Sequence, residues 1–256
     1  MEEENEDILE RFRHAFDVEG GQFHVVEYSV PIDVQMEYFK YSEQMRKNNI
    51  HVADNEYEES RANLWDATLS PTRRKHILSA LALTNNVKAY RLLEAYVKQA
   101  EPDPEIVEWA QMALMESRIM MESELLEEKQ IYISTGLGGK GDKLRFFVLL
   151  LANGGQVFKD YQKQIVEREF NYALSKQNSE IERIAMHDLY IEMVLLIPMR
   201  YDIKSILSNV ISECNQYGEF IADEVTITNV KELSETEIDE VLKHYHESSK
   251  HTQASR

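Results

Sequence analysis

The sequence has little cysteine: Cys214 is the only one, so no disulfide can form within the chain. A single cysteine among apolar residues on a predicted helix is most often a small core residue. The neighbouring sequence offers no residue that would support a redox or nucleophilic role. We therefore predict a structural role for Cys214.

Long hydrophobic runs are also absent. The longest are FFVLLLA and MVLLIPM, well short of the roughly 20 apolar residues that a membrane-spanning helix needs. The first residues, MEEENEDILERF, contain neither the basic region nor the apolar core of a secretory signal. By elimination, the sequence predicts a cytoplasmic location and no membrane partner.

Basic residues are outnumbered: 28 Lys and Arg face 46 Asp and Glu, for a formal net charge of −18. Such a surface repels nucleic-acid phosphate and anionic lipid at long range. Apart from Arg73, Arg74 and Lys75, the basic residues are scattered. We therefore expect no DNA binding, and the charge also argues against RNA, although a local basic patch would override it. Solubility explains most of the negative charge.

The strongest local signal is the run LRFFVLLL at residues 144–151. In an extended chain its two faces are both apolar, which is typical of a central strand covered on both sides. Glycines on either side of the run favour a strand over a short buried helix. Before this region the chain reads mainly as helices, and after it strands and helices alternate.

This change of pattern predicts an α+β or α/β chain in two parts. We expect an acidic N-terminal segment at 1–19, carrying a short amphipathic helix, and a mainly helical interaction domain at 20–128. A small α/β sandwich at 129–246 and a disordered tail at 247–256 would follow. At 256 residues, the chain is long enough for two ordinary domains.

The helical part carries several start signals. Asp33 and Asp54 are predicted N-caps, and Ser70 and Asp103 each precede a proline, which suits the first helical position. Met36, Phe39 and Tyr41 are among the apolar residues of the helix expected over 34–47. The segment FHVVEYSV at 23–30 has the composition of a strand, with no obvious partner.

Two segments, SPTRRKHILSALAL and DPEIVEWAQMALMESR, lie within residues 54–128. They resemble members of HEAT or armadillo helical repeats. That family implies stacked helix pairs presenting a protein-binding surface, and it carries no catalytic residues to transfer. No strict repeat period is present, so an ordinary helical bundle fits these residues as well.

In the second part we predict strands at 144–151, 189–198 and 225–230, and a helix at 156–175. Two further helices are predicted from their caps, Asp202 for one and Ser234 with Glu237 for the other. If residues 180–186 form a strand, the order is βαββαβ, and a ferredoxin-like sandwich is the preferred version. In that fold the first strand has no free side for a further strand at 131–134. A hairpin between 131–134 and 144–151 would therefore require another strand order.

The segment STGLGGKGDK at 134–143 is the one candidate binding site. Successive glycines can turn backbone N–H groups towards an anion, and two lysines add positive charge. The candidate ligand-binding residues are Thr135, Gly136, Gly138, Gly139, Lys140, Gly141 and Lys143. The spacing matches neither a Walker A loop nor a dinucleotide-binding fingerprint. The alternative is a hairpin connection that needs glycine for turn geometry alone.

Other arrangements offer less chemistry. The tract HYHESSKH at 244–251 has weak metal-binding spacing, and Glu122, Glu124, Glu127 and Glu128 have the spacing of a solvated helix face. We predict no catalytic residues, no metal and no cofactor. The leading hypothesis is a non-enzymatic cytoplasmic interaction protein that binds a protein partner or self-associates. The alternative is a protein that binds a phosphate-bearing ligand or a nucleotide through residues 135–143. For such a protein, an enzymatic activity stays an open alternative.

Overall fold

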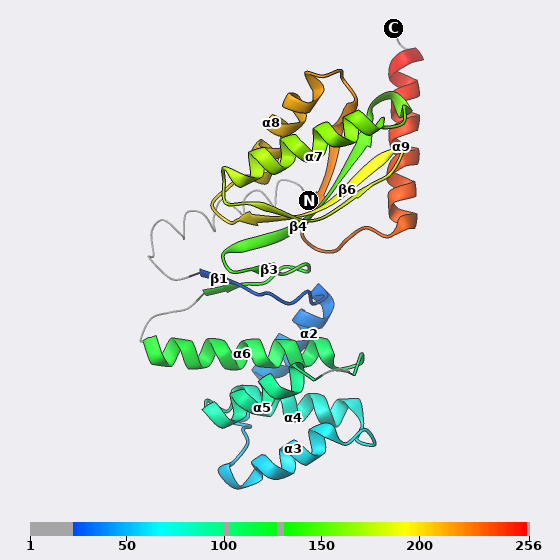
Figure 1. The fold of residues 1–256 in the computed structure, drawn as a ribbon. Helices are drawn as coiled ribbons and strands as arrows, with labels where there is room; N and C mark the ends of the chain where they lie inside the picture. Colours follow the sequence, from blue (N-terminus) through cyan, green and yellow to red (C-terminus); the bar gives the residue numbers. More distant parts are fainter. Residues whose placement is uncertain (1–22, 100–102, 127–130, 255–256) are drawn as a thin grey trace. The chain divides into compact units, whose positions relative to one another are not determined.

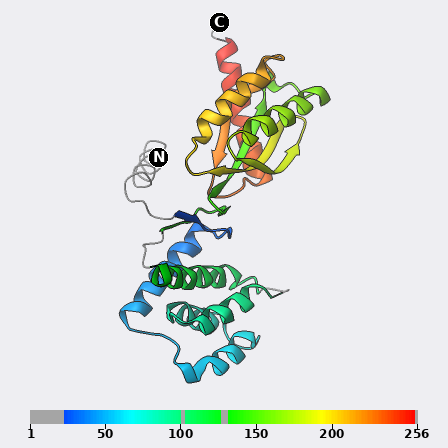
Figure 2. The ribbon, with the colours of Figure 1, turned by 60° about the vertical axis from the view of Figure 1, so that its left-hand side comes forward.

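A computed structural model describes residues 23–99, 103–126 and 131–254 (Figures 1 and 2). The chain mixes α-helices with an antiparallel sheet, and it divides into two compact units between Gly136 and Leu137. The segment expected at 1–19 and the expected domain limits at 20, 128 and 129 lie outside the described residues. None of the described helices combines the length and the apolar character that crossing a membrane requires.

The first unit is built from helices. They are α2 (Ile32–Lys47), α3 (Tyr57–Trp65), α4 (Pro71–Leu83), α5 (Val87–Val97) and α6 (Val107–Leu126), with a 3-10 turn η1 (Asp54–Glu56) before α3. Helices α2, α4 and α5 all contact α6, which is therefore the central helix of this unit. Packing around one central helix does not confirm the resemblance to HEAT or armadillo repeats.

The start signals of these helices were predicted with mixed success. Ser70 accepts a hydrogen bond from the Arg73 backbone N–H at 3.4 Å, which confirms the predicted cap before Pro71. The predicted cap at Asp33 is wrong, because α2 already begins at Ile32 after Pro31. Pro31 occupies the N-cap position without a side-chain cap, and its carbonyl accepts a hydrogen bond from the Gln35 N–H of the first turn at 3.0 Å.

Asp103 does not cap α6 directly. Its carboxylate accepts from the Glu105 backbone N–H at 3.0 Å, but residues 104–106 form a turn and the helix begins at Val107. The same carboxylate forms an ion pair with the buried side chain of Arg74 at 2.7 Å. Asp103 therefore connects the start of α6 to α4, a role that its position before a proline did not indicate.

The core of the first unit lies between α6 and the helices around it. Tyr38, Leu78, Leu81 and Leu93 are all fully buried in it. The buried Trp109 ring of α6 also has its polar atom satisfied, because its indole N–H donates to the Ser79 hydroxyl at 3.0 Å. A buried donor without an acceptor would be costly, so this hydrogen bond lets the large ring occupy the core.

Two short strands complete the first unit. Strand β1 (Phe23–Val25) pairs in parallel with β2 (Ile131–Ile133), and the Val26 N–H continues the pairing to the Ile133 carbonyl at 2.9 Å. The expected strand at 23–30 is therefore much shorter than predicted. The considered hairpin between 131–134 and 144–151 does not form. Strands β1 and β2 are separated in the sequence by the whole helical region, so local sequence patterns could not reveal that they pair.

The second unit contains a curled antiparallel sheet with helices. Its elements are β3 (Gly139–Lys140), β4 (Lys143–Ala152), the turn η2 (Asn153–Gly155), α7 (Asp160–Ser175), β5 (Glu180–Met186), β6 (Tyr190–Pro198), α8 (Ile203–Asn215), β7 (Ile221–Thr228) and α9 (Glu235–Ala254). Strand β4 lies between β6 and β7, β5 lies beyond β6, and β3 pairs with the start of β4. Residues 180–186, whose pattern was ambiguous, form a strand.

Strand β4 is buried on both faces, as its sequence predicted. Val148 and Leu150 pack in one core with α7 and α8, whereas Phe147 and Leu149 pack in a second core that includes Ile238 of α9. Figure 1 shows α7 and α8 on one face of the sheet and α9 on the other. Alternate side chains of one strand therefore supply two hydrophobic layers.

The predicted caps of the last two helices are confirmed. Asp202 accepts hydrogen bonds from the Lys204 and Ser205 N–H groups, and Ser234 with Glu237 forms the predicted capping box. However, α9 continues to Ala254, so the predicted end near Tyr245 and the tail expected from 247 are corrected as far as residue 254. No glycine or proline interrupts residues 235–254, so the backbone has no local reason to leave the helix.

Cys214 is buried on α8, which confirms its prediction as a core residue. Burial raises the pKa of its thiol to about 12. The thiolate is the reactive form of cysteine, so this thiol is inert at neutral pH.

Candidate functional site: a groove between α2 and α6

The glycine-rich segment predicted from the sequence forms a chain connection. Thr135 and Gly136 end the first unit, where their carbonyls accept hydrogen bonds from Gln35 (3.3 Å) and Ser29 (2.9 Å). From Leu137 onwards the segment belongs to the second unit, and the Leu137 N–H donates to the Asn229 carbonyl at 3.0 Å. The candidate residues therefore have several of their backbone groups in structural hydrogen bonds.

Two glycines of this segment, Gly138 and Gly141, have a positive φ that favours glycine. Gly138 has φ 65°, and its carbonyl accepts from the Arg145 N–H at 3.0 Å. Gly139 and Lys140 pair with Leu144 and Lys143, which leaves Gly141 (φ 62°) as the first residue of a two-residue hairpin turn. A glycine with positive φ is the usual residue at that position of a type II′ turn.

Both lysines of the segment have carboxylates nearby. The Lys143 Nζ lies 3.1 Å from a carboxylate oxygen of Glu180. The pKa of Glu182 is lowered, chiefly by its hydrogen bonds from Arg145, and the charge of Lys140 contributes as well. These carboxylates reduce the positive potential that an anion would need.

We therefore expect the wild-type protein to show no change in melting temperature with millimolar inorganic phosphate or ATP. The measurement is a thermal-shift titration of the full chain, with a Lys140→Ala, Lys143→Ala double variant as control. A saturating ligand at 100 times its dissociation constant would stabilise the protein by about 2.7 kcal/mol. A shift of that size that disappears in the double variant would make the loop an anion site.

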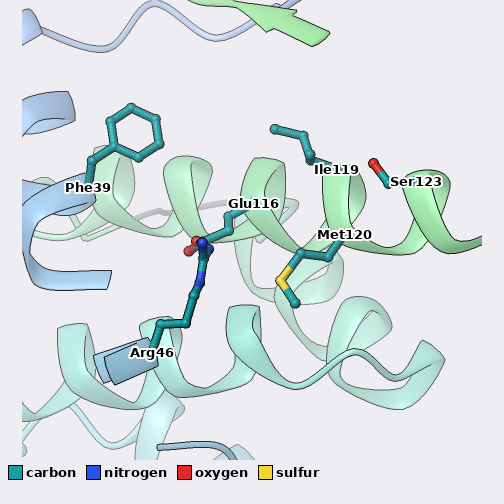
Figure 3. Close-up of a pocket in the computed structure, with 6 residues that line it drawn as sticks. All are labelled: Phe39, Arg46, Glu116, Ile119, Met120 and Ser123. Carbon is teal, nitrogen blue, oxygen red and sulfur yellow. The ribbon is translucent and has the colours of Figure 1, made fainter. Parts of the chain in front are cut away.

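A different surface offers a binding site that is open to solvent. A groove of about 550 Å³ lies between α2 and α6, and Figure 3 shows its lining side chains. Helix α2 contributes Phe39 and Arg46, and α6 contributes Glu116, Ile119, Met120 and Ser123. The groove is therefore apolar over most of its lining, with one ion pair.

That ion pair is part of a buried hydrogen-bond cluster. The Glu116 carboxylate accepts from the Tyr38 hydroxyl (2.7 Å), the Ser42 hydroxyl (2.7 Å) and the Arg46 guanidinium (2.6 Å). The Glu116 side chain is 8% exposed, whereas that of Arg46 is 61% exposed. Burial, and then the adjacent Glu116, raise the pKa of Tyr38 well above its usual value. The carboxylate is thus a fixed structural acceptor rather than a free base.

Exposed apolar side chains lie on the same two helices. Ile32, Met36 and Phe39 follow one another at helical spacing on α2, and Leu125 lies towards the end of α6. Met36 is 69% exposed, Phe39 46% and Leu125 76%. Residues three and four apart share a helix face, so Ile32, Met36 and Phe39 form one apolar stripe. Leu125, two positions after Ser123, lies on another side of α6 than the residues that line the groove. We call Ile32, Met36, Phe39 and the groove the α2/α6 surface.

No cysteine or histidine lines the groove, and within the described residues no group of histidines, cysteines and carboxylates has the arrangement of a metal site. Sequence reasoning placed Met36 and Phe39 among the apolar residues of this helix but did not identify the surface. The buried positions Tyr38, Ser42 and Met45 fall on another face of α2, and this offset was the available signal.

Comparisons with known proteins do not place the chain in a family. No protein family model matches it, and no curated protein does. A putative transposase from Deinococcus radiodurans R1 has a TM-score of 0.36 and 13% identity, over 41% of this chain and 92% of that chain. A REP-associated tyrosine transposase bound to a REP hairpin has a TM-score of 0.31 and 11% identity, over 41% of this chain and 62% of that chain. A homoserine dehydrogenase from Thiobacillus denitrificans has a TM-score of 0.23 and 9% identity, over 50% of this chain and 29% of that chain. Likenesses of this size carry no argument about function.

Proposed function

We propose that this protein is a non-enzymatic interaction protein whose first unit binds a protein partner through the α2/α6 surface. The observation that carries the proposal is the exposure of Met36 and Phe39 beside an apolar groove. Single exposed apolar side chains are common, but a cluster that borders a groove is typical of a binding surface. A cytoplasmic location is part of the same proposal.

The partner element that fits this surface is an amphipathic helix. A groove between two helices accepts a third helix in the manner of a bundle, with apolar residues at helical spacing as anchors. Burying one side chain such as Phe39 or Met36 contributes about 1.5–3 kcal/mol before the entropy of association is subtracted. The exposed Arg46 guanidinium has further N–H donors for a polar group of the partner.

The proposal also includes one fold assignment for each unit, a helical surface in the first and a sandwich in the second. The resemblance of residues 54–128 to HEAT or armadillo repeats implies a protein-binding role for the helices. For the second unit we propose a ferredoxin-like sandwich, supported by the order β4-α7-β5-β6-α8-β7 and by the place of β4 between β6 and β7. Strand β2 presents no difficulty for it, since β2 pairs with β1.

The test is site-specific photo-crosslinking followed by an affinity measurement. A photoreactive phenylalanine analogue is placed at Phe39 or Met120, which both line the groove, in cells, and at Val87 as the control. Val87 is an apolar residue of the same unit that is 52% exposed and lies outside the groove. We expect the same partner protein to be crosslinked from Phe39 and Met120 and not from Val87.

Affinity for that partner is then measured by calorimetry. Met36→Ser with Phe39→Ser should weaken binding more than about tenfold, because two buried anchors are lost. Val87→Ser should leave the affinity unchanged. The proposal is wrong if Phe39 and Met120 yield no crosslink above the Val87 control, or if the double variant binds as tightly as wild type.

A further inference from the structure

The sheet of the second unit has one open edge, at β7. In the described part of the chain β7 pairs with β4 alone, so no strand lies along the outer side of residues 225–228. These residues, Val-Thr-Ile-Thr, are half-buried and β-branched, a composition that favours extended backbone. An edge strand presents unpaired N–H and C=O groups in alternation, which is a template for another strand.

The opposite edge, β5, is protected. Its pairing with β6 has an irregularity between Ile181 and Arg183, and its side chains include Glu180 and Glu182. These charges form ion pairs with Lys143 and Arg145 of β4. Bulges and charges on an edge strand prevent the approach of a further strand.

The pairing of β7 with β4 is also irregular, between Leu150 and Ala152, and β7 carries Asp223 and Glu224. Residues 225–228, in contrast, pair with β4 in unbroken register and carry no charge, so this part of β7 is the edge available to a further strand.

A groove runs beside the open edge. It has a volume of about 740 Å³ and lies between β7 and α8. Its lining is mixed: Leu207, Ile211, Val225 and Ile227 are apolar, and most of the other lining residues are polar or charged. At one end the Asn215 side chain bonds to both the N–H and the C=O of Ile221, at 3.0 Å each. The edge is thus closed at Ile221 by a side chain and is open further along the strand.

The two ends of the groove carry opposite charge. Strand β4 is antiparallel to both β6 and β7, so β6 and β7 are parallel and the connecting α8 runs antiparallel to them. The exposed carboxylates Glu219 and Asp223 lie at the end where α8 finishes and β7 begins. Lys204, also exposed, lines the groove from the other end of α8.

We propose that this protein forms a homodimer through β7, with two copies of the strand paired antiparallel about a two-fold axis perpendicular to the sheet. About such an axis both α8 helices lie on the same side of the joined sheet and run antiparallel. Lys204 of each copy then meets the end of the groove that carries Asp223 in the other copy. A groove with opposite charges at its ends is self-complementary in this arrangement, which is the requirement of an isologous dimer.

The surface of α8 permits this approach. Ser208 and Ser212 are exposed, line the groove and have short side chains, so two α8 helices can come close over the joined strands. The half-buried Val225 and Ile227 would lose their remaining contact with water. The surface of the groove thus suits a second copy in shape and in charge.

The first experiment measures the mass of the full chain in solution by sedimentation and light scattering from micromolar concentration upwards. We expect a concentration-dependent species of twice 30.0 kDa. Ser208→Arg with Ser212→Arg places bulk in the interface and should give a monomer. Asn209→Arg, on an exposed position of the same helix outside the groove, should remain a dimer. Circular dichroism checks that each variant is folded.

Charge reversal then tests the proposed arrangement of the two copies, in which Lys204 of one copy meets Asp223 of the other. Lys204→Glu and Asp223→Lys should each weaken the dimer about threefold to tenfold, since exposed ion pairs are individually weak and occur twice in the dimer. The double variant should recover the wild-type affinity. Net charge alone predicts otherwise, because Asp223→Lys makes the protein less negative and would reduce repulsion between copies.

Three results would overturn the proposal. One is a monomer at all concentrations, which would leave the edge to a segment of another protein. The second is a dimer that Ser208→Arg with Ser212→Arg does not dissociate, or that Asn209→Arg dissociates equally. The third is a dimer lost on Phe39→Ser, since that residue belongs to the α2/α6 surface of the first unit.

Discussion

Phe147→Ala will lower the free energy of unfolding of the second unit by about 3–5 kcal/mol. Phe147 is fully buried at the centre of β4, on the face that packs with Ile238 of α9. The core on this face contains few residues, so little remains to fill the cavity that a lost ring leaves. The measurement is urea unfolding of the full chain followed by far-ultraviolet circular dichroism.

The matched control is Tyr161→Ala. Tyr161 is also aromatic and lies in the second unit, on α7, but it is 50% exposed. Its removal should change the free energy of unfolding by less than about 1 kcal/mol. Equal effects of the two substitutions would contradict the assignment of β4 as the buried central strand.

Glu116→Ala will lower the free energy of unfolding of the first unit by about 2–5 kcal/mol. The substitution removes the acceptor of the buried Tyr38 and Ser42 hydroxyls and the partner of Arg46. The Tyr38 ring packs on Trp109 with centroids 5.1 Å apart, so tryptophan fluorescence during urea unfolding reports this region. Glu122→Ala, which breaks the exposed ion pair with Arg118, should cost less than about 1 kcal/mol.

The same cluster sets a pH dependence. The pKa of Tyr38 is raised in the folded protein, first by burial and then by Glu116, so the folded state holds the phenolic proton more tightly than the unfolded state. The resulting stability is fully present below the unfolded pKa of about 10 and is lost as the pH rises above it. In the Glu116→Ala variant, the decrease in the free energy of unfolding at alkaline pH should be smaller. A cluster without energetic importance would show neither the destabilisation nor the change in pH dependence.

The two proposed binding surfaces belong to different units, and different interactions would stabilise their complexes. On the α2/α6 surface, helices already satisfy their own backbone hydrogen bonds, so a partner gains mainly by burying apolar side chains. At β7, a partner strand also supplies hydrogen bonds to backbone groups that the sheet leaves unpaired. Phe39→Ser should therefore affect only the first kind of binding, and Ser208→Arg only the second.

Local signals in the sequence were reliable where one segment decides its own structure. The burial of β4 on both faces follows from eight consecutive residues, and the caps at Ser70 and Asp202 follow from side chains that bond to the next turn. The glycines at 138 and 141 likewise mark positions of positive φ. Each of these features depends on atoms a few residues apart.

Features that depend on distant segments were not available from the sequence. The partner of β1 is β2, at the far end of the helical region. The start of α2 after Pro31 and the length of α9 also differ from prediction, but for local reasons. The exposure of Met36 and Phe39 is of the same kind, because an apolar residue on a helix is buried only where another element covers it. Nothing within α2 states which of its faces α6 will cover.

The sequence by itself determined the mixture of helices and strands, the central strand at 144–151 and the acidic charge, since these depend on composition and short-range periodicity. Only the tertiary structure decided which edge of the sheet stays open and which apolar side chains remain in solvent. The physical reason is that burial and strand pairing are properties of two surfaces in contact. Val225 and Ile227 have the sequence pattern of ordinary strand residues, and only the order of strands shows that β7 has no outer neighbour among the residues that the structure describes.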